Sequence, residues 1–211
     1  NVAVIFQNGH EWFRQIGTAN SPGTKLFTVC GNVKRRGVFE FPMGINLKDL
    51  IYDVCGGMEE GHELMAVQTG GASGAIINAG QIDMVLDIDT VSNSGGRLGC
   101  GTMDDRNCII DIVRNNLDFF RDESCGKCTP CREGGTRLYQ LISKIAEGRG
   151  SVKDIHTIED LAETMRLTAL CGLGHSTAVP VLSSIQNFYS VYLHHIDKEY
   201  CHVCSQEGGI L

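Results

Sequence analysis

The first half of the chain alternates short apolar runs with turn-forming segments. Four β-prone runs are expected as strands, at residues 25–30, 37–41, 64–67 and 75–77. The basic turn 31–36 separates the first two runs and predicts a hairpin. Asn46 is placed to cap a short helix whose apolar residues reach Val54 at helical spacing, and Gly56 and Gly57 follow as a stop. This order predicts a small α+β unit in which one helix covers one sheet.

Beyond Asn107 the apolar residues recur at the spacing of an α-helix. Four stripes are expected on four helices, at Ile109 to Phe120, Leu138 to Ile145, Ile158 to Ala169 and Leu182 to Ile196. Thr157 and Asp160 resemble a capping box at the start of the third helix, and Pro180 suits the first turn of the fourth. Four amphipathic helices predict a bundle. Residues 82–106, between the two halves, are expected to be irregular.

Composition and charge narrow the class of protein. The chain is 42% hydrophobic and 20% charged, with a net charge of -7, and its basic residues cluster only at 34–36. A nucleic-acid-binding surface is therefore not expected. No apolar run approaches the ~18 residues that a membrane span needs, and the first residues lack the features of a secretory signal. We expect a cytoplasmic or organellar chain, and because it begins with Asn1 we expect part of a longer protein.

The strongest chemical signal among the ten cysteines is a loop between the first two expected helices. Three cysteines follow one another there at spacings of three residues: Cys125, Cys128 and Cys131. Gly126 and Pro130 allow the loop to curl, and three thiolates so placed are typical of an iron–sulfur cubane with a remote fourth ligand. Cys171 is the only further cysteine in the expected helices after this loop, so we predict that it completes a [4Fe-4S] site. Lys127 and Arg132 would offset the negative charge of the cluster.

Other sites were weighed for the same residues. Zinc normally uses two separated C-x2-C knuckles, so a triple overlapping run suits one tetrahedral ion poorly. A thioredoxin-type pair would follow a strand, whereas this loop follows a helix. The turn 70–74 lacks the Gly-Lys-Ser/Thr of a phosphate-binding loop, and Ser73 lacks the Gly-x-Ser-x-Gly setting of a nucleophile. We therefore expect a plain turn at 70–74.

Residues 123–134, Glu-Ser-Cys-Gly-Lys-Cys-Thr-Pro-Cys-Arg-Glu-Gly, together with Leu-Cys-Gly-Leu-Gly at 170–174, resemble a known family. They are similar to the C-terminal part of the NADH-oxidising flavoprotein subunit of respiratory complex I, a subunit type that also occurs in NAD(P)-linked hydrogenases and formate dehydrogenases. Residues 23–27, 42–44 and 70–74 resemble that family's soluble-ligand-binding β-grasp domain. The implied fold class is α+β, with a small β-grasp domain followed by a four-helix bundle that binds an iron–sulfur cluster.

The resemblance implies an electron path in which a hydride is taken from NADH by FMN and single electrons pass through the [4Fe-4S] cluster to partner subunits of a redox complex. The family's FMN and NADH lie mostly on an N-terminal domain with a glycine-rich loop. No such loop occurs in this sequence, so we expect an electron-transfer fragment that is inactive alone. Asn1 resembles the end of a flavin-contacting motif, and Gly172 and Leu173 would face the flavin. A redox-inert β-grasp binding module joined to a metal-stapled bundle is the alternative.

The expected organisation has five parts: a remnant of the FMN domain or a linker (1–24), the β-grasp domain (25–81), an irregular junction (82–106), the iron–sulfur bundle (107–197) and a cysteine-rich tail (198–211). In hydrogenase-linked members of the family the matching tail can carry zinc. We predict a structural zinc here, with C-x2-C as its knuckle and a family-matched cysteine before the bundle. Its four ligands would be Cys108, His195, Cys201 and Cys204. His194 and His202 are alternative ligands.

Overall fold

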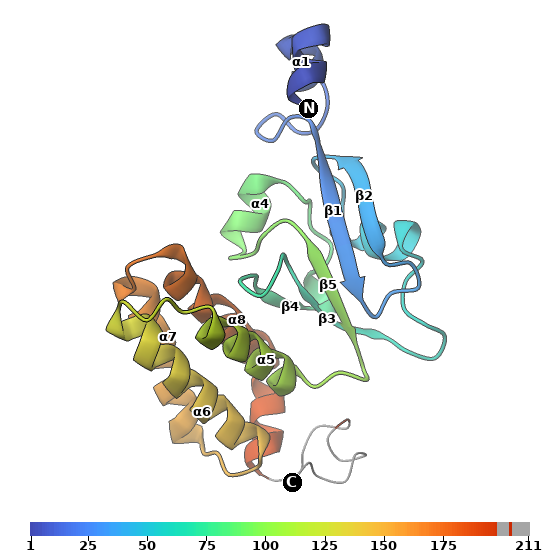
Figure 1. The fold of residues 1–211 in the computed structure, drawn as a ribbon. Helices are drawn as coiled ribbons and strands as arrows, with labels where there is room; N and C mark the ends of the chain where they lie inside the picture. The colour runs from blue at the N-terminus through green and yellow to red at the C-terminus, as the bar shows by residue number, and fades with distance from the viewer. Residues whose placement is uncertain (198–202, 204–211) are drawn as a thin grey trace. The chain divides into compact units, whose positions relative to one another are not determined.

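The computed structural model describes residues 1–197 and residue 203. The expected zinc ligands Cys201 and Cys204, and the alternative ligand His202, lie outside the described residues. The chain divides into two compact units, one made of 1–71 with 78–104 and the other of 72–77 with the chain from Asp105 on. A mixed sheet with short helices, followed along the chain by a helical region, confirms the expected α+β class (Figure 1).

The strands form one mixed sheet in the order β2-β1-β5-β3-β4. Their bounds are β1 (Thr24–Gly31), β2 (Gly37–Pro42), β3 (Leu64–Gln68), β4 (Ile76–Asn78) and β5 (Cys100–Asp104). β1 and β2 are antiparallel, with Phe27 opposite Phe39, which confirms the expected hairpin. β5 pairs in parallel with β1 and antiparallel with β3, so it occupies the middle of the sheet (Figure 1).

The expectation that residues 82–106 are irregular is wrong. This segment contains α4 (Ile88–Asn93), whose first turn is capped by the Asp87 carboxylate accepting from the Thr90 amide, and the central strand β5. The sequence of β5, Cys-Gly-Thr-Met-Asp, has little intrinsic preference for a strand. It becomes one because β1 and β3 supply hydrogen-bonding partners on both of its edges.

The expected short helix is present. It consists of α3 (Leu47–Asp49) and a π-helical turn, η1 (Leu50–Val54). The Asn46 side chain accepts from the Lys48 amide at 2.8 Å, which confirms the predicted cap. Gly56 and Gly57 end the helix with φ angles of 77° and 71°, a region that residues with a side chain rarely adopt. A 3-10 turn, η2 (Ala79–Gln81), and two N-terminal helices without buried residues, α1 (Val2–Asn8) and α2 (His10–Arg14), complete this part.

The second unit is a helical bundle (Figure 1). Its elements are α5 (Ile109–Asp122), η3 (Pro130–Gly134), α6 (Gly135–Ala146), α7 (Val152–Thr168) and α8 (Gly172–Ile196). Apolar residues on each of the four α-helices are buried, as their spacing predicts. No helix among residues 1–197 combines the length and the apolar character that crossing a membrane requires.

Two helix starts differ from the sequence prediction. α7 is capped by Ser151, whose hydroxyl accepts from the Asp154 amide, and not by Thr157, which lies inside the helix. α8 begins at Gly172, so Pro180 lies within it and not in its first turn. Glycine is a poor helix former, so the glycine-rich start of α8 carries no periodic signal.

The segment 72–77 is anchored on α8 within the second unit. The Ile76 amide donates to the Ser183 hydroxyl at 2.9 Å, and the Asn187 amide group donates to the Ile76 carbonyl at the same distance. The next residue of α8, Phe188, leaves helical geometry with φ -136° and ψ 33°. A piece of extended chain is thus bound by two side chains of one helix, just before that helix is kinked.

Candidate metal centre

The three-cysteine loop joins α5 to α6. The chain leaves α5 after Asp122 and turns at Gly126, whose φ of 74° favours glycine. The Arg132 guanidinium donates from Nη1 to the Gly126 carbonyl at 2.6 Å. The loop is therefore curled back onto the helical turn that follows it, as the positions of Gly126 and Pro130 led us to expect.

Cys131 is the buried member of the loop. It lies in the π-helical turn η3, where the Ser124 Oγ is 3.3 Å from its Sγ. The Gly126 amide donates to the same Ser124 oxygen at 3.3 Å. Sequence reasoning missed Ser124, because nothing in the spacing of the cysteines shows that the curl brings this hydroxyl back to Cys131.

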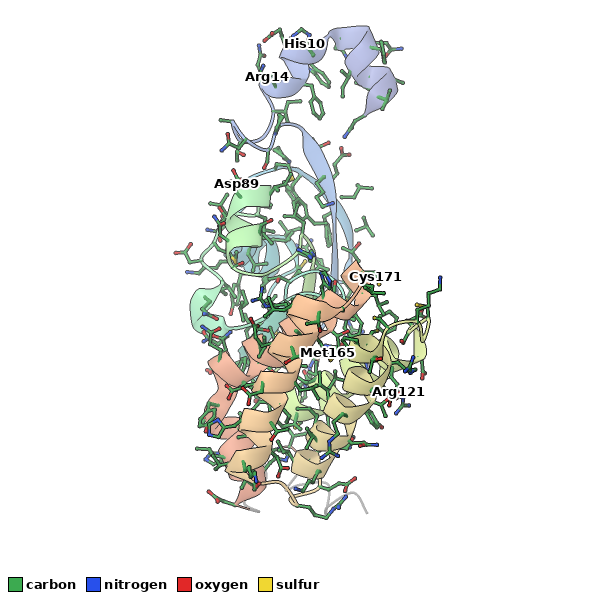
Figure 2. All side chains as sticks on the ribbon, turned by 90° about the vertical axis from the view of Figure 1, so that its left-hand side faces the viewer. His10, Arg14, Asp89, Arg121, Met165 and Cys171 are labelled. Carbon is green, nitrogen blue, oxygen red and sulfur yellow. The ribbon has the colours of Figure 1, made fainter. Side chains whose placement is uncertain are left out.

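The turn between α7 and α8, which carries Cys171, adjoins this loop (Figure 2). A Cβ built on Gly174 would lie 3.3 Å from the Cβ of Cys131 and 3.7 Å from its Sγ. The backbone amide of Leu170 is the main cause that lowers the pKa of the Cys128 thiol. The structure thus brings the remote segment around Cys171 to the loop that carries Cys128 and Cys131.

The thiols differ in exposure and are spread apart. Cys125 and Cys171 are exposed, Cys128 is half-buried and Cys131 is buried; all four are free and lie in the described part of the chain. No three of their sulfurs lie within 4.8 Å of one another. Two sulfurs on one tetrahedral zinc would be about 3.8 Å apart, given a Zn–S bond of about 2.3 Å. In this arrangement the sulfurs are not gathered around one tetrahedral ion.

Basic side chains surround the loop, as expected. Arg132 binds the Gly126 carbonyl with Nη1 and the Glu133 carboxylate with Nε at 2.8 Å, so it both holds the loop and is partly neutralised. Its charge also contributes, as a minor cause, to the lowered pKa of Cys128. Lys127 is exposed on the same loop. The charge of Arg132 thus favours the thiolate form of Cys128, the form that a metal requires.

A second pair of candidate ligands meets inside the bundle. Cys108, at the N-terminus of α5, and His195, in the last turn of α8, are both buried, and the Cys108 Sγ lies 3.5 Å from the His195 Nε2. Burial lowers the pKa of His195, while a hydrogen bond to the Ala146 backbone partly opposes that shift, so the imidazole is neutral at pH 7. A sulfur and a nitrogen on one tetrahedral zinc would lie about 3.6 Å apart, from bond lengths of about 2.3 and 2.05 Å. The pair fits two of the four predicted zinc ligands.

The three residues expected near the flavin fall in different units. Asn1 belongs to the first unit, where it lines a cavity of about 230 Å³ together with Thr24, Lys25, Leu26 and Glu40. Gly172 and Leu173 belong to the second unit and form the first turn of α8. Gly172 is exposed and Leu173 is half-buried. Each residue is thus accessible within its own unit.

Comparison with protein families finds two matches. Residues 111–195 match the NADH-ubiquinone oxidoreductase-F iron-sulfur binding region, and residues 26–76 match the SLBB domain. The predicted cluster ligands Cys125, Cys128, Cys131 and Cys171 all lie within the first match.

Similar proteins include components of two kinds of redox complex. NADP-reducing hydrogenase subunit HndC of Solidesulfovibrio fructosivorans is 40% identical over 210 residues, which are 97% of this chain and 43% of that protein. The F subunit of the NADH-quinone oxidoreductase of Mycobacterium tuberculosis is 37% identical over 204 residues, 95% of this chain and 46% of that protein. The crystal structure of an NAD+-reducing [NiFe]-hydrogenase in the H2-reduced state matches with a TM-score of 0.82 and 33% identity, over 94% of this chain and 33% of that one. The chain spans less than half the length of each of these proteins.

Proposed function

We propose that this chain relays electrons within an NAD(P)H-oxidising flavoprotein subunit. The reason is that it belongs by homology to the family of the NADH-quinone oxidoreductase F subunit and hydrogenase subunit HndC. Its SLBB domain and iron–sulfur binding region correspond to the C-terminal part of those proteins. Cys125, Cys128, Cys131 and Cys171 would hold a [4Fe-4S] cluster, which supplies one-electron transfer when bound. FMN and NAD(H) would be bound by the complete subunit.

One observation carries this proposal. The segment 170–174, which carries Cys171, adjoins the three-cysteine loop, and no three of the four sulfurs lie within 4.8 Å of one another. A thiolate loop that meets one remote cysteine is the donor arrangement of a cubane. A redox-inert module with a zinc at the loop would instead need sulfurs packed about 3.8 Å apart.

The residues of the loop would have different roles in such a site. Cys131, which lies in η3 against the start of α8, is buried and so keeps its sulfur away from water. Arg132 ties the loop closed and Gly126 provides its turn. Cys125 and Cys171 are exposed. We propose that electrons enter and leave past this exposed edge, where Gly172 and Leu173 would face the flavin and other subunits would dock.

The 211 residues alone should neither bind NADH tightly nor oxidise it, because no Gly-x-Gly-x-x-Gly loop that could seat a pyrophosphate occurs in the sequence. We propose that Asn1 contributes a flavin contact in the complete subunit, and that this subunit works in the cytoplasm or on the matrix side of a membrane-attached complex. Measurable NADH turnover by the 211 residues would contradict the proposal that only the complete subunit binds and oxidises NADH.

The test is anaerobic isolation of the full chain, followed by iron, sulfide and zinc analysis and by electron paramagnetic resonance (EPR) after reduction. We expect about four irons and four sulfides per chain, brown colour and a reduced-state signal. A quadruple variant with Ser at Cys125, Cys128, Cys131 and Cys171 is the control and should be colourless. Colourless wild-type protein without iron after reconstitution with iron and sulfide would overturn the proposal and favour the redox-inert module.

A separate structural zinc at Cys108 and His195 is the second proposal. The 3.5 Å between the Cys108 Sγ and the His195 Nε2 matches the span across a tetrahedral zinc. Cys201 and Cys204 would complete the site from the tail. Such an ion would tie the end of α8 to the start of α5.

A further inference from the structure

The hydroxyl of Ser124 faces the sulfur of Cys131. The two atoms lie 3.3 Å apart, and Cys131 is the buried cysteine of the loop. We infer that Ser124 donates a hydrogen bond to the Cys131 sulfur when that sulfur is a cluster ligand, and that this bond raises the reduction potential of the cluster. The inference deepens the proposed [4Fe-4S] function and depends on it.

The direction of the hydrogen bond follows from the chemistry of the two groups. A thiol and a hydroxyl can each donate, but a sulfur bound to iron is a thiolate without a hydrogen. The hydroxyl of Ser124 is then the donor. Its oxygen already accepts from the Gly126 amide at 3.3 Å, which leaves the hydroxyl hydrogen for Cys131. Accepting one bond also polarises the hydroxyl and strengthens the bond that it donates.

The surrounding loop holds Ser124 in this position. The Gly126 amide donates to the Ser124 hydroxyl, and the Gly126 carbonyl accepts from Arg132 at 2.6 Å. Gly126 adopts a left-handed φ of 74°, which glycine accepts without the strain that a side chain would cause. Ser124 itself is half-buried and its acceptor is buried, so water would replace the hydroxyl poorly.

The expected effect follows from charge. Reduction adds an electron to the cluster and makes its ligand sulfurs better hydrogen-bond acceptors, so a donor favours the reduced state. We expect loss of the hydroxyl to lower the equilibrium constant for one-electron reduction roughly three- to tenfold. Tenfold corresponds to about 59 mV for one electron.

The test compares midpoint potentials of the anaerobic full chain by EPR-monitored redox titration. Ser124→Ala should shift the potential downward. Ser124→Thr and Ser124→Val form a matched pair, because the two side chains have nearly the same shape and only Thr keeps the hydroxyl. We expect Ser124→Thr to stay close to wild type and Ser124→Val to follow Ser124→Ala, with about four irons in every variant.

A second measurement, pulsed EPR, detects the proton of the Ser124 hydroxyl. Pulsed EPR of the reduced wild-type and Ser124→Thr chains in deuterated buffer should show an exchangeable hyperfine coupling that the Ala and Val variants lack. Equal potentials for Ser124→Thr and Ser124→Val, with full iron content, would overturn the inference and leave the cluster assignment intact. A wild-type chain that takes up no iron contradicts the proposed function instead. If Ala and Val abolish the cluster, Ser124→Cys decides, because its thiol is a weaker donor than the hydroxyl: a lowered potential supports the inference and an unchanged potential overturns it.

Discussion

The Sγ of Cys108 lies 3.5 Å from the Nε2 of His195, although the two residues are far apart in the chain. Cys108 is the N-cap residue of α5, the first helix of the bundle, and His195 lies in the last turn of α8, its last helix. Both side chains are buried. Burial lowers the pKa of His195 and so keeps the imidazole in the neutral form that metals bind. Two helix ends that are distant in sequence thus present a sulfur and a nitrogen at one point.

We predict that Cys108→Ala removes the bound zinc. Wild type should contain about one zinc per chain beside four irons, and the variant should retain the irons and lose the zinc, because a tetrahedral site that loses a thiolate binds far more weakly. Cys30→Ala, at an exposed cysteine on β1, is the control and should keep its zinc. Elemental analysis of the three proteins is the measurement. Iron without zinc in wild type would refute the prediction.

Cys171→Ser should remove or alter the cluster, because serine oxygen is a poorer ligand than thiolate for iron–sulfur chemistry. Iron content should fall, or the reduced-state EPR signal should change. Cys55→Ser changes a buried cysteine of the first unit and should leave both unchanged. An unaltered signal and four irons in Cys171→Ser would mean that the remote ligand is another residue.

Gly134 and Gly135 form a matched pair for testing how tightly η3 packs against α7. A Cβ on Gly134 would lie 2.7 Å from the Met165 Sδ and 2.8 Å from its Cγ, whereas a Cβ on Gly135 meets nothing within 4 Å. Both residues have helical φ and ψ. We expect Gly134→Ala to destabilise the chain by about 1–3 kcal/mol and Gly135→Ala to stabilise it by up to about 1 kcal/mol.

Chemical denaturation of the reconstituted chains measures both effects. Equal unfolding midpoints for the two alanine variants would show that Met165 moves aside without cost. A destabilised Gly135→Ala would show that the start of α6 is more crowded than the structure indicates.

The carboxyl of Asp154 should make stability depend on pH. Burial opposes its ionisation, but hydrogen bonds from Lys144 at 2.8 Å and from Ser151 at 2.6 Å outweigh burial and lower the pKa of Asp154. A carboxyl whose pKa is lower in the folded chain stabilises that chain above its unfolded pKa of about 3.9. The contribution is lost as the pH falls through the folded value.

Asp154→Asn should therefore lower the unfolding temperature at pH 7, by no more than the few degrees that about 1 kcal/mol represents. The difference from wild type should shrink as the pH falls from about 5 to 3. Asp160→Asn, at another carboxyl of α7, is the control. A deficit for Asp154→Asn that stays constant over this pH range would contradict the assignment.

Local signals in the sequence predicted much of the fold. The Asn46 cap, the Gly56-Gly57 stop, the hairpin of β1 and β2 and the apolar stripe of α5 were all predicted and are present. Each depends on residues close together in the chain. The predicted starts of α7 and α8 were wrong. The Ser151 cap of α7 precedes the apolar stripe of that helix, and α8 begins with a glycine-rich turn, so neither start shows a periodic apolar signal in the sequence.

The sequence by itself determined which cysteines we propose as cluster ligands, because the C-x2-C-x2-C spacing and the residues around it are local features. Only the tertiary structure decided what each residue faces. Pairing on both edges made β5 a central strand, and helix packing brought Gly174 to Cys131 and His195 to Cys108. The curl of the loop brought the Ser124 hydroxyl to the sulfur of Cys131. Such contacts join residues that have no periodic relation in the chain, so the close packing of whole elements, and not local propensity, sets them.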